Sequence, residues 1–302
     1  MRFIINVIKG AIIGIANVIP GVSGGTMAVS LGIYERLIHV LTHIRKEWKQ
    51  NIGFLLAIVI GAAIGVVGFA QAVEFLLVNH ALVTALAFVG LVLGGIPIIL
   101  KSLNESLAKE NKKFSVSHVI IFVIFCAIVV VMALFSGTEG TGIAKEIGIL
   151  DMLMLLLVGA IASAAMVIPG VSGSMMMMIL GYYDTIITTI NRFIESLLAF
   201  DIMAMLDCCK VLVPFGIGVL VGIVAIAKLI DFLFRKFASQ TFTAILGLIV
   251  ASPGAILLNT KNEYGFDLGV LPVIIGGVLL VVCFVITYWF GNKSSEEKKV
   301  EK

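Results

Sequence analysis

Two stretches of this chain are near copies of each other. Residues 10–38 read GAIIGIANVIPGVSGGTMAVSLGIYERLI, and residues 159–187 read GAIASAAMVIPGVSGSMMMMILGYYDTII. At an offset of 149 residues, 16 of these 29 positions are identical, and both copies hold Pro-Gly-Val-Ser-Gly, beginning at Pro20 and Pro169. Further along, at an offset of 157, the pattern Gly61-x-x-x-Gly65 matches Gly218-x-x-x-Gly222. The chain is therefore an internal duplication.

The composition is typical of a protein that lies in lipid. Hydrophobic residues make up 60% of the 302 residues and charged residues only 13%, with a mean hydropathy of +1.16. Soluble domains have roughly 45–50% apolar and about 25% charged residues. The net charge of +3 is too small to suggest a nucleic-acid partner. We expect an all-α polytopic membrane protein, of an oligomeric state that the sequence leaves open.

The cysteines and histidines do not suggest a metal site or a cofactor. None of the four cysteines belongs to a Cys-x-x-Cys pair, which argues against a metal site or a disulfide framework. The four histidines (His39, His43, His80 and His118) lie at the ends of apolar segments, where interfacial positions are the simplest interpretation. We therefore expect neither a metal nor a cofactor.

Ten apolar segments alternate with short loops. They fall at about 3–19, 26–42, 52–78, 82–100, 116–135, 152–168, 174–190, 211–234, 242–258 and 269–290. A spanning helix needs ~20 apolar residues, whereas ~10–14 suit a re-entrant segment. The segments beside each Pro-Gly are short, with eleven positions from Lys9 to Pro20 and twelve from Ser23 to Glu35. We predict two re-entrant hairpins, 3–19 with 26–42 and 152–168 with 174–190, and six full spans.

The distribution of basic residues predicts the orientation. With these segments, every loop rich in Lys or Arg falls on one side, which the positive-inside rule makes cytoplasmic. Both termini are then cytoplasmic in a multi-pass protein, and this parity is the same if the hairpins span fully. Three spans in each half make the repeat an inverted one, with halves at 1–148 and 149–292 and a charged cytoplasmic tail at 293–302. Inverted repeats with broken helices at the midplane are typical of alternating-access transporters.

The repeated motif has the residues of an anion site. Proline ends a half-helix, glycine permits a tight turn, and serine is a natural N-cap for the returning helix. Two helix N-termini meeting near the pseudo-two-fold axis would attract a phosphate or carboxylate. A tight turn with no ligand is the structural alternative. The expected substrate-binding residues are Pro20, Gly21, Ser23, Gly24, Gly25, Thr26, Pro169, Gly170, Ser172, Gly173 and Ser174.

Two repeat-related pairs of carboxylates are candidates for proton coupling. Glu74 corresponds to Asp231, and Glu35 corresponds to Asp184. Carboxylates inside a membrane often relay protons. Each of these residues also lies near the end of a segment, where an interfacial charge is an equally good interpretation, and both remain open.

The motifs resemble those of the PopT-type undecaprenyl phosphate translocase family of bacterial membrane proteins. The resemblance rests on four stretches and covers essentially the whole chain: Val18-Ile-Pro-Gly-Val-Ser-Gly-Gly-Thr26, Val167-Ile-Pro-Gly-Val-Ser-Gly-Ser174, Gly90-Leu-Val-Leu-Gly-Gly-Ile-Pro97 and Gly247-Leu-Ile-Val-Ala-Ser-Pro-Gly254. It implies a non-enzymatic flippase that recycles undecaprenyl phosphate from the outer to the inner leaflet of the bacterial cytoplasmic membrane for cell-wall and peptidoglycan synthesis. The identity of the lipid comes only from this resemblance.

Two other functions compete with this one. Integral-membrane undecaprenyl pyrophosphate phosphatases have a motif similar to Pro-Gly-x-Ser-Arg-Ser-Gly-x-Thr, but Gly24 and Gly173 stand here where the arginine would be. Phosphoryl transfer needs a cationic or metal clamp on the developing charge, and none lies near the motif in sequence. A small-anion secondary transporter could use the same helix ends, and the sequence separates it poorly from a lipid carrier.

Overall fold

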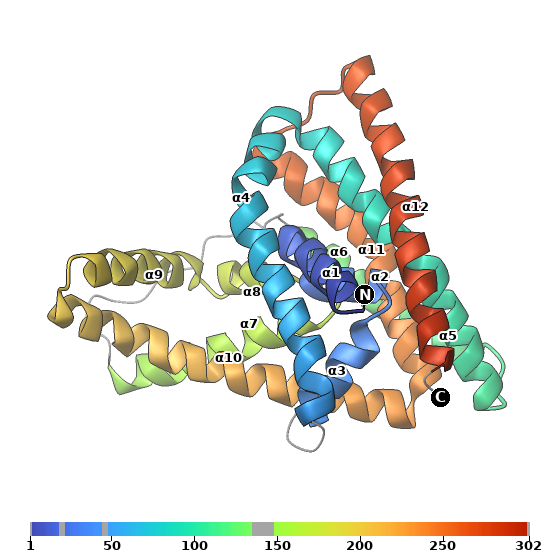
Figure 1. The fold of residues 1–302 in the computed structure, drawn as a ribbon, viewed down its shortest axis with the longest axis horizontal. Helices are drawn as coiled ribbons and strands as arrows, with labels where there is room; N and C mark the ends of the chain where they lie inside the picture. The colour runs from blue at the N-terminus through green and yellow to red at the C-terminus, as the bar shows by residue number, and fades with distance from the viewer. Residues whose placement is uncertain (1, 18–21, 44–47, 135–147, 301–302) are drawn as a thin grey trace. The chain divides into compact units, whose positions relative to one another are not determined.

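Helices account for the regular secondary structure in the part of the chain that the structure describes. This computed structural model describes residues 2–17, 22–43, 48–134 and 148–300 (Figure 1). Its helices are α1 (Arg2–Asn17), α2 (Gly24–Ser30), α3 (Tyr34–His43), α4 (Trp48–Leu93), α5 (Ile96–Lys109), α6 (Val116–Leu134), α7 (Ile149–Val167), α8 (Gly173–Ile179), α9 (Tyr183–Leu198), α10 (Ile202–Lys236), α11 (Ala238–Tyr264) and α12 (Val270–Val300). The all-α prediction is confirmed.

Six stretches are long and apolar enough to cross a membrane, within the described residues. They are Asn51–Lys109, Val116–Leu134, Ile149–Val167, Ile202–Lys236, Ala238–Tyr264 and Val270–Lys293. The first holds 59 residues, far more than the ~20 that one crossing needs. It contains the break that we predicted at 79–81, because His80 has non-helical φ/ψ of −141° and 46° and α4 turns back there (Figure 1). The expected loop is thus reduced to a kink.

The segment before the second motif is longer than we expected. Helix α7 has 19 residues and is long enough to span a membrane. Its repeat partner α1 has 16 residues, and its apolar part, Phe3–Asn17, is shorter than a typical span. A re-entrant geometry is therefore not required by the length of α7. The predicted orientation is unaffected, because both geometries give the same parity.

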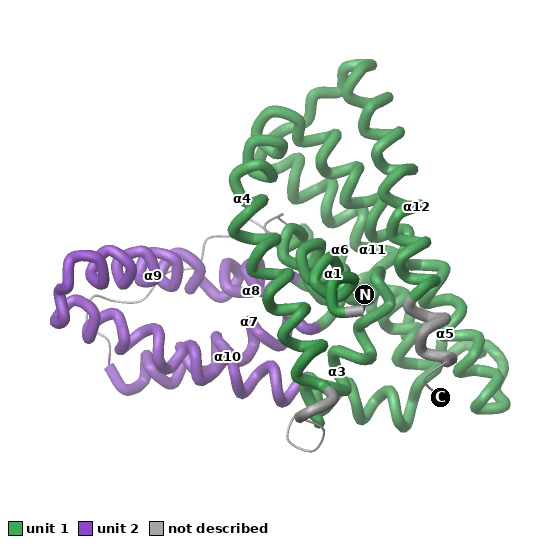
Figure 2. The backbone as a smooth tube through the Cα atoms, viewed as in Figure 1, with its two compact units in different colours: residues 1–134, 168–171, 227–302 green, residues 135–167, 172–226 purple. Residues whose placement is uncertain are grey.

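The chain divides into two compact units (Figure 2). Unit 1 comprises residues 1–134, 168–171 and 227–302, and unit 2 comprises 135–167 and 172–226. This division crosses the boundary between the proposed sequence halves. Helices α11 and α12, from the second half, pack in unit 1 against α4, α5 and α6 from the first. The two sequence halves therefore reflect the internal duplication, whereas the two compact units reflect which helices pack together.

In unit 1, α1 and α4 approach each other through glycines. A Cβ added to Gly61 or Gly65 of α4 would overlap the carbonyl oxygens of Val7 and Ala11 in α1. Small residues at such a contact let helix backbones come close, which is how helices associate in lipid without a hydrophobic driving force. Gly10 and Gly14 of α1 face the backbone of α4 in the same way.

Unit 2 contains the duplicate of this contact. A Cβ at Gly218 or Gly222 of α10 would overlap the carbonyl oxygens of Leu156 and Ala160 in α7. Gly218 and Gly222 correspond to Gly61 and Gly65 in the repeat. Beside the contact, Leu155, Ile186 and Val211 form a buried apolar cluster. The duplicated sequence therefore makes the same helix contact twice.

A polar cluster joins the end of α5 to the start of α11. The Glu110 carboxylate accepts hydrogen bonds from the Ser239 N–H at 3.0 Å and from its Oγ at 2.8 Å. The buried His118 ring lies 3.3 Å from the same Oγ. Burial raises the pKa of Glu110, but the bonds from Ser239 and the Lys112 ammonium outweigh it, so this pKa lies below its ordinary value. The cluster links the two sequence halves within unit 1.

The glycine contact predicts that adding one methyl group to α4 lowers the stability of the protein at Gly61 but not at Gly68. Gly61→Ala should destabilise the protein by about 1–3 kcal/mol, because the new Cβ must push α1 away from α4. Gly68→Ala is the matched control on the same helix, since its Cβ would meet nothing within 4 Å. Thermal unfolding in detergent measures both. Equal midpoints for the two variants would show that the α1–α4 contact is not as close as described.

Candidate functional site

In the first motif copy, α2 begins as the sequence predicts. Ser23 is its N-cap, with φ −112° and ψ 146°, and its Oγ accepts a hydrogen bond from the Thr26 N–H at 3.1 Å. The Gly24 N–H donates to Asn17 Oδ1 at 2.9 Å. Asn17, the last residue of α1, therefore caps the helix that follows. Pro20 and Gly21, which we expected to end the first half-helix and form the turn, lie outside the described residues.

The second copy has the same cap. Ser172 is the N-cap of α8, although its Oγ lies 3.5 Å from the Met175 N–H, so this bond is long. Its hydroxyl also lies 2.8 Å from Ser174 Oγ. Both expected caps, Ser23 and Ser172, are therefore present.

Each returning segment is broken again, which the sequence did not lead us to expect. We predicted single segments at 26–42 and 174–190, but α2 and α8 have seven residues each. Gly32 follows α2 with φ +69°, and Gly181 follows α8 with φ +79°. Glycine is the residue that adopts this left-handed conformation at little cost, so each short helix ends there. Helices α3 and α9 then begin at Tyr34 and Tyr183.

The two motifs meet at one hydrogen bond inside unit 1. The Gly170 N–H, from the second motif, donates to the Thr26 hydroxyl of the first at 2.6 Å. Gly170 has φ +79°, and a Cβ there would lie 3.0 Å from both Leu248 O and Ser252 Oγ of α11. Thr26 and Gly170 are both buried. Loop 168–171 is therefore fixed between α2 and α11, whereas Ser172, Gly173 and Ser174 belong to unit 2.

The two copies differ in polarity around the helix start. Asn17 of the first copy corresponds to Met166, and Thr26 corresponds to Met175. Asn17 bonds the backbone of Gly24, whereas Met166 packs its side chain against Gly173 so closely that a Cβ there would overlap it. The buried hydroxyls of Ser23 and Thr26 and the exposed amide of Asn17 thus surround the first helix start, and methionine surrounds the second.

Sequence reasoning did not predict the burial of Lys9, which lies inside α1 and is only 3% exposed. Lys9, Ile13 and Asn17 are spaced by four residues and so share one face of α1. Ile13 and Asn17 are the side chains nearest to Gly24. This spacing was the feature of the sequence from which the burial of Lys9 could have been predicted. Ser252, buried on α11 beside Gly170, was missed as well.

The four candidate proton-coupling residues lie in different surroundings. Glu74 of α4 and Asp184 of α9 are exposed, and Glu35 in the first turn of α3 is half-buried. Asp231 of α10 forms an ion pair with Arg235 at 2.6 Å. The repeat-related residues Glu74 and Asp231 therefore lie in different environments. A role in proton coupling stays a prediction for all four residues.

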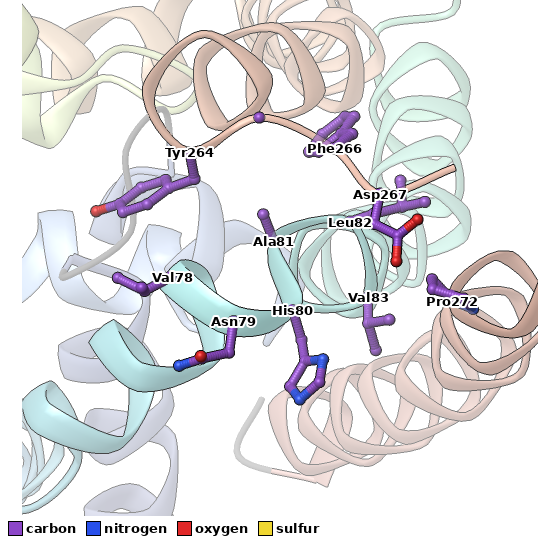
Figure 3. A pocket seen from close by; sticks show the side chains of 11 residues that line it. Val78, Asn79, His80, Ala81, Leu82, Val83, Tyr264, Phe266, Asp267 and Pro272 are labelled. Carbon is purple, nitrogen blue, oxygen red and sulfur yellow. The ribbon is translucent and has the colours of Figure 1, made fainter. Parts of the chain in front are cut away.

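A separate cavity of about 370 Å³ lies beside the kink of α4 (Figure 3). Its lining comes from residues 78–83 of α4, from residues 264–267 at the end of α11 and just after it, and from Pro272 of α12. Asn79, His80, Tyr264 and Asp267 are its polar side chains (Figure 3). The expected site residues do not line it, and its carboxylate makes it a poor place for a phosphate.

Comparison with known proteins gives one family and two relatives. Residues 13–266 match the model of a family described as VCA0040-like, undecaprenyl phosphate translocase-like. A Staphylococcus aureus protein named polyprenyl-phosphate transporter is 28% identical over 297 residues, which cover 97% of this chain and 98% of the relative. A Vibrio cholerae protein of the same name is 27% identical over 273 residues, covering 83% and 77% respectively. No solved structure matches the chain.

The bond between the motifs predicts the effect of removing one hydroxyl. Thr26→Val should destabilise the protein by about 1–3 kcal/mol, because the buried Gly170 N–H then lacks its acceptor in a nearly isosteric side chain. Thr26→Ser retains the hydroxyl and should lose much less. The thermal midpoint in detergent distinguishes the two variants. If valine and serine were equally tolerated, the Thr26–Gly170 bond would contribute nothing to stability.

Proposed function

Because this chain belongs to the undecaprenyl phosphate translocase-like family, we propose that it transports a polyprenyl phosphate across a membrane. The family match agrees with the resemblance recognised from the repeated motifs. Both relatives carry transporter names, and their matches extend over most of each chain. Six stretches of spanning length support a multi-pass membrane protein. These names describe transport and not an enzymatic reaction.

The specific substrate in this proposal is undecaprenyl phosphate. The protein would return this carrier from the outer to the inner leaflet of the bacterial cytoplasmic membrane, where cell-wall polymers including peptidoglycan are begun. The family description supports the choice of lipid. The distribution of Lys and Arg supports cytoplasmic termini in that membrane.

The proposed headgroup site is built on the first motif. Ser23, Gly24, Gly25 and Thr26 would face the phosphate, and Pro20, Gly21 and Pro169 would shape the two turns. Gly170 would contribute its N–H, and a role in binding for Ser172, Gly173 and Ser174, which belong to unit 2, stays a prediction. The observation that carries this proposal is the Thr26–Gly170 hydrogen bond, because it joins the two motif loops at buried polar groups.

The chemistry of these groups suits reversible binding. Hydroxyls and backbone N–H groups can donate to a phosphate without fixing a permanent charge beside it. To bind, the phosphate would replace Asn17 Oδ1 and Thr26 Oγ1 as acceptors for the Gly24 and Gly170 N–H groups. The prenyl chain would stay in lipid while the head crosses.

The same chemistry argues against the phosphatase alternative. Gly24 and Gly173 occupy the positions at which those enzymes have an arginine in the motif. Gly24 is in contact with Asn17 and Ile13, and Gly173 with Met166 and Ala162, so neither helix start has a guanidinium in the arginine's place. Without a cationic clamp at this position, the charge that develops in phosphoryl transfer would be poorly stabilised.

A reconstituted assay tests the substrate and the site separately. Proteoliposomes would contain undecaprenyl phosphate with a radiolabelled phosphate, and an added impermeant phosphatase would release label only from the outer leaflet. We expect wild-type protein to equilibrate the two leaflets, and Ser23→Ala/Ser172→Ala to slow this at least about tenfold, as expected for a loss of ~1.4 kcal/mol.

The matched control is Ser106→Ala/Ser196→Ala. These two serines are also buried, lie one in each half, and bond only to the carbonyl four residues earlier in their own helices, at 2.8 and 2.7 Å. The control should transport like the wild type. Failure of wild-type protein to move the lipid would reject the substrate. Equal rates for the motif variant and the control would reject the site.

A further inference from the structure

We propose that His39, His43 and Asp231 form a binding site for a divalent transition-metal ion of the zinc class. His39 and His43 are four residues apart on α3, and Asp231 lies on the part of α10 that belongs to unit 1. One ligand atom from each residue falls within 4.8 Å of the other two. From the sequence we expected no metal site, because no Cys-x-x-Cys pair is present and the histidines lie at the ends of apolar segments.

A cation already lies between two of these ligand atoms. Arg235 Nη2 is 2.9 Å from His43 Nε2 and 2.6 Å from Asp231 Oδ2. A guanidinium can only donate hydrogen bonds, so His43 Nε2 must be the unprotonated, accepting nitrogen of its ring. The Arg235 nitrogen therefore marks a point at which an imidazole lone pair and a carboxylate oxygen converge on positive charge.

The other side of the His43 ring is held as in metal-binding histidines. Its Nδ1 lies 3.1 Å from the His39 carbonyl oxygen and 2.8 Å from Thr42 Oγ1. With Nε2 accepting, the ring proton is on Nδ1 and is donated to these oxygens. A ligating histidine usually donates its second nitrogen to a carbonyl or carboxylate in this way, which fixes the tautomer and orients the ring. The His39 ring is stacked on His43 with a centroid distance of 4.4 Å.

The set of ligands selects the class of metal. Two imidazoles and one carboxylate suit zinc, with a fourth position left for water, whereas calcium and magnesium prefer oxygen ligands throughout. Arg235 is a weak competitor because its side chain is 60% exposed, and solvent weakens an ion pair whose cation is exposed. The metal would displace Arg235 into solvent and tie α3 to α10.

The competition with Arg235 gives the proposal a distinctive test. Full-length protein in detergent, freed of metal with a chelator, would be titrated with Zn²⁺ by calorimetry. We expect one Zn²⁺ per chain, at least about tenfold weaker binding by His43→Ala and by Asp231→Asn, and tighter binding by Arg235→Ala. Tighter binding by the arginine variant is an effect that a purely structural ion pair would not produce.

His80→Ala is the control, because this histidine lies at the kink of α4 and takes no part in the cluster; it should bind Zn²⁺ like the wild type. Titration with Co²⁺ adds an optical readout, since wild-type protein should give the visible absorption of a tetrahedral site and His39→Ala should lose it. Thermal midpoints without metal check that the variants are folded. Absence of Zn²⁺ binding by wild-type protein, or unchanged binding by folded His43→Ala and Asp231→Asn, would overturn the proposal.

Discussion

A helix that is broken inside a membrane must find new partners for the backbone groups that the break sets free, and the rest of this structure depends on how that is done. Lipid offers no hydrogen bonds, so irregular backbone is tolerated only where protein groups replace them. Here Asn17 accepts from Gly24, Ser23 accepts from Thr26, and Thr26 accepts from Gly170. The motif residues are therefore structural caps first, and any ligand they bind must take over these same bonds.

The duplication supplied two equal helix contacts but two unequal sites. Glycines bring α1 against α4 and α7 against α10 in corresponding positions, so the scaffold has been kept in both copies. Around the helix starts the copies have diverged, with Asn17 and Thr26 in one and Met166 and Met175 in the other. In the proposed transporter, the first copy would hold the phosphate with its side chains, and Gly170 of the second copy would add its backbone N–H.

The sequence predicted those features that depend on local chemistry. Apolar runs located the spanning helices, serine located both caps, and the polar stretch at 79–81 located the turn in α4. The breaks at Gly32 and Gly181 were missed, because a glycine in an apolar run does not reveal its φ. The approach of Asp231 to His43 was missed for another reason: it depends on helices packed across a long separation in sequence, and no local pattern records such packing.

The composition of unit 1 determines the order in which the protein can be assembled. Its helices α1 to α6 are synthesised first, and α11 and α12 last, with the whole of unit 2 translated in between. Until then Gly90 and Gly94 of α4 lack the α12 backbone against which they pack, and α6 lacks Gly247 of α11. During biosynthesis the early helices must therefore remain in the bilayer without their final neighbours, and loop 168–171 can reach its position only when the carboxyl-terminal helices arrive. A chain whose synthesis stopped before α11 would contain both motifs but would lack the α11 residues against which Gly170 packs.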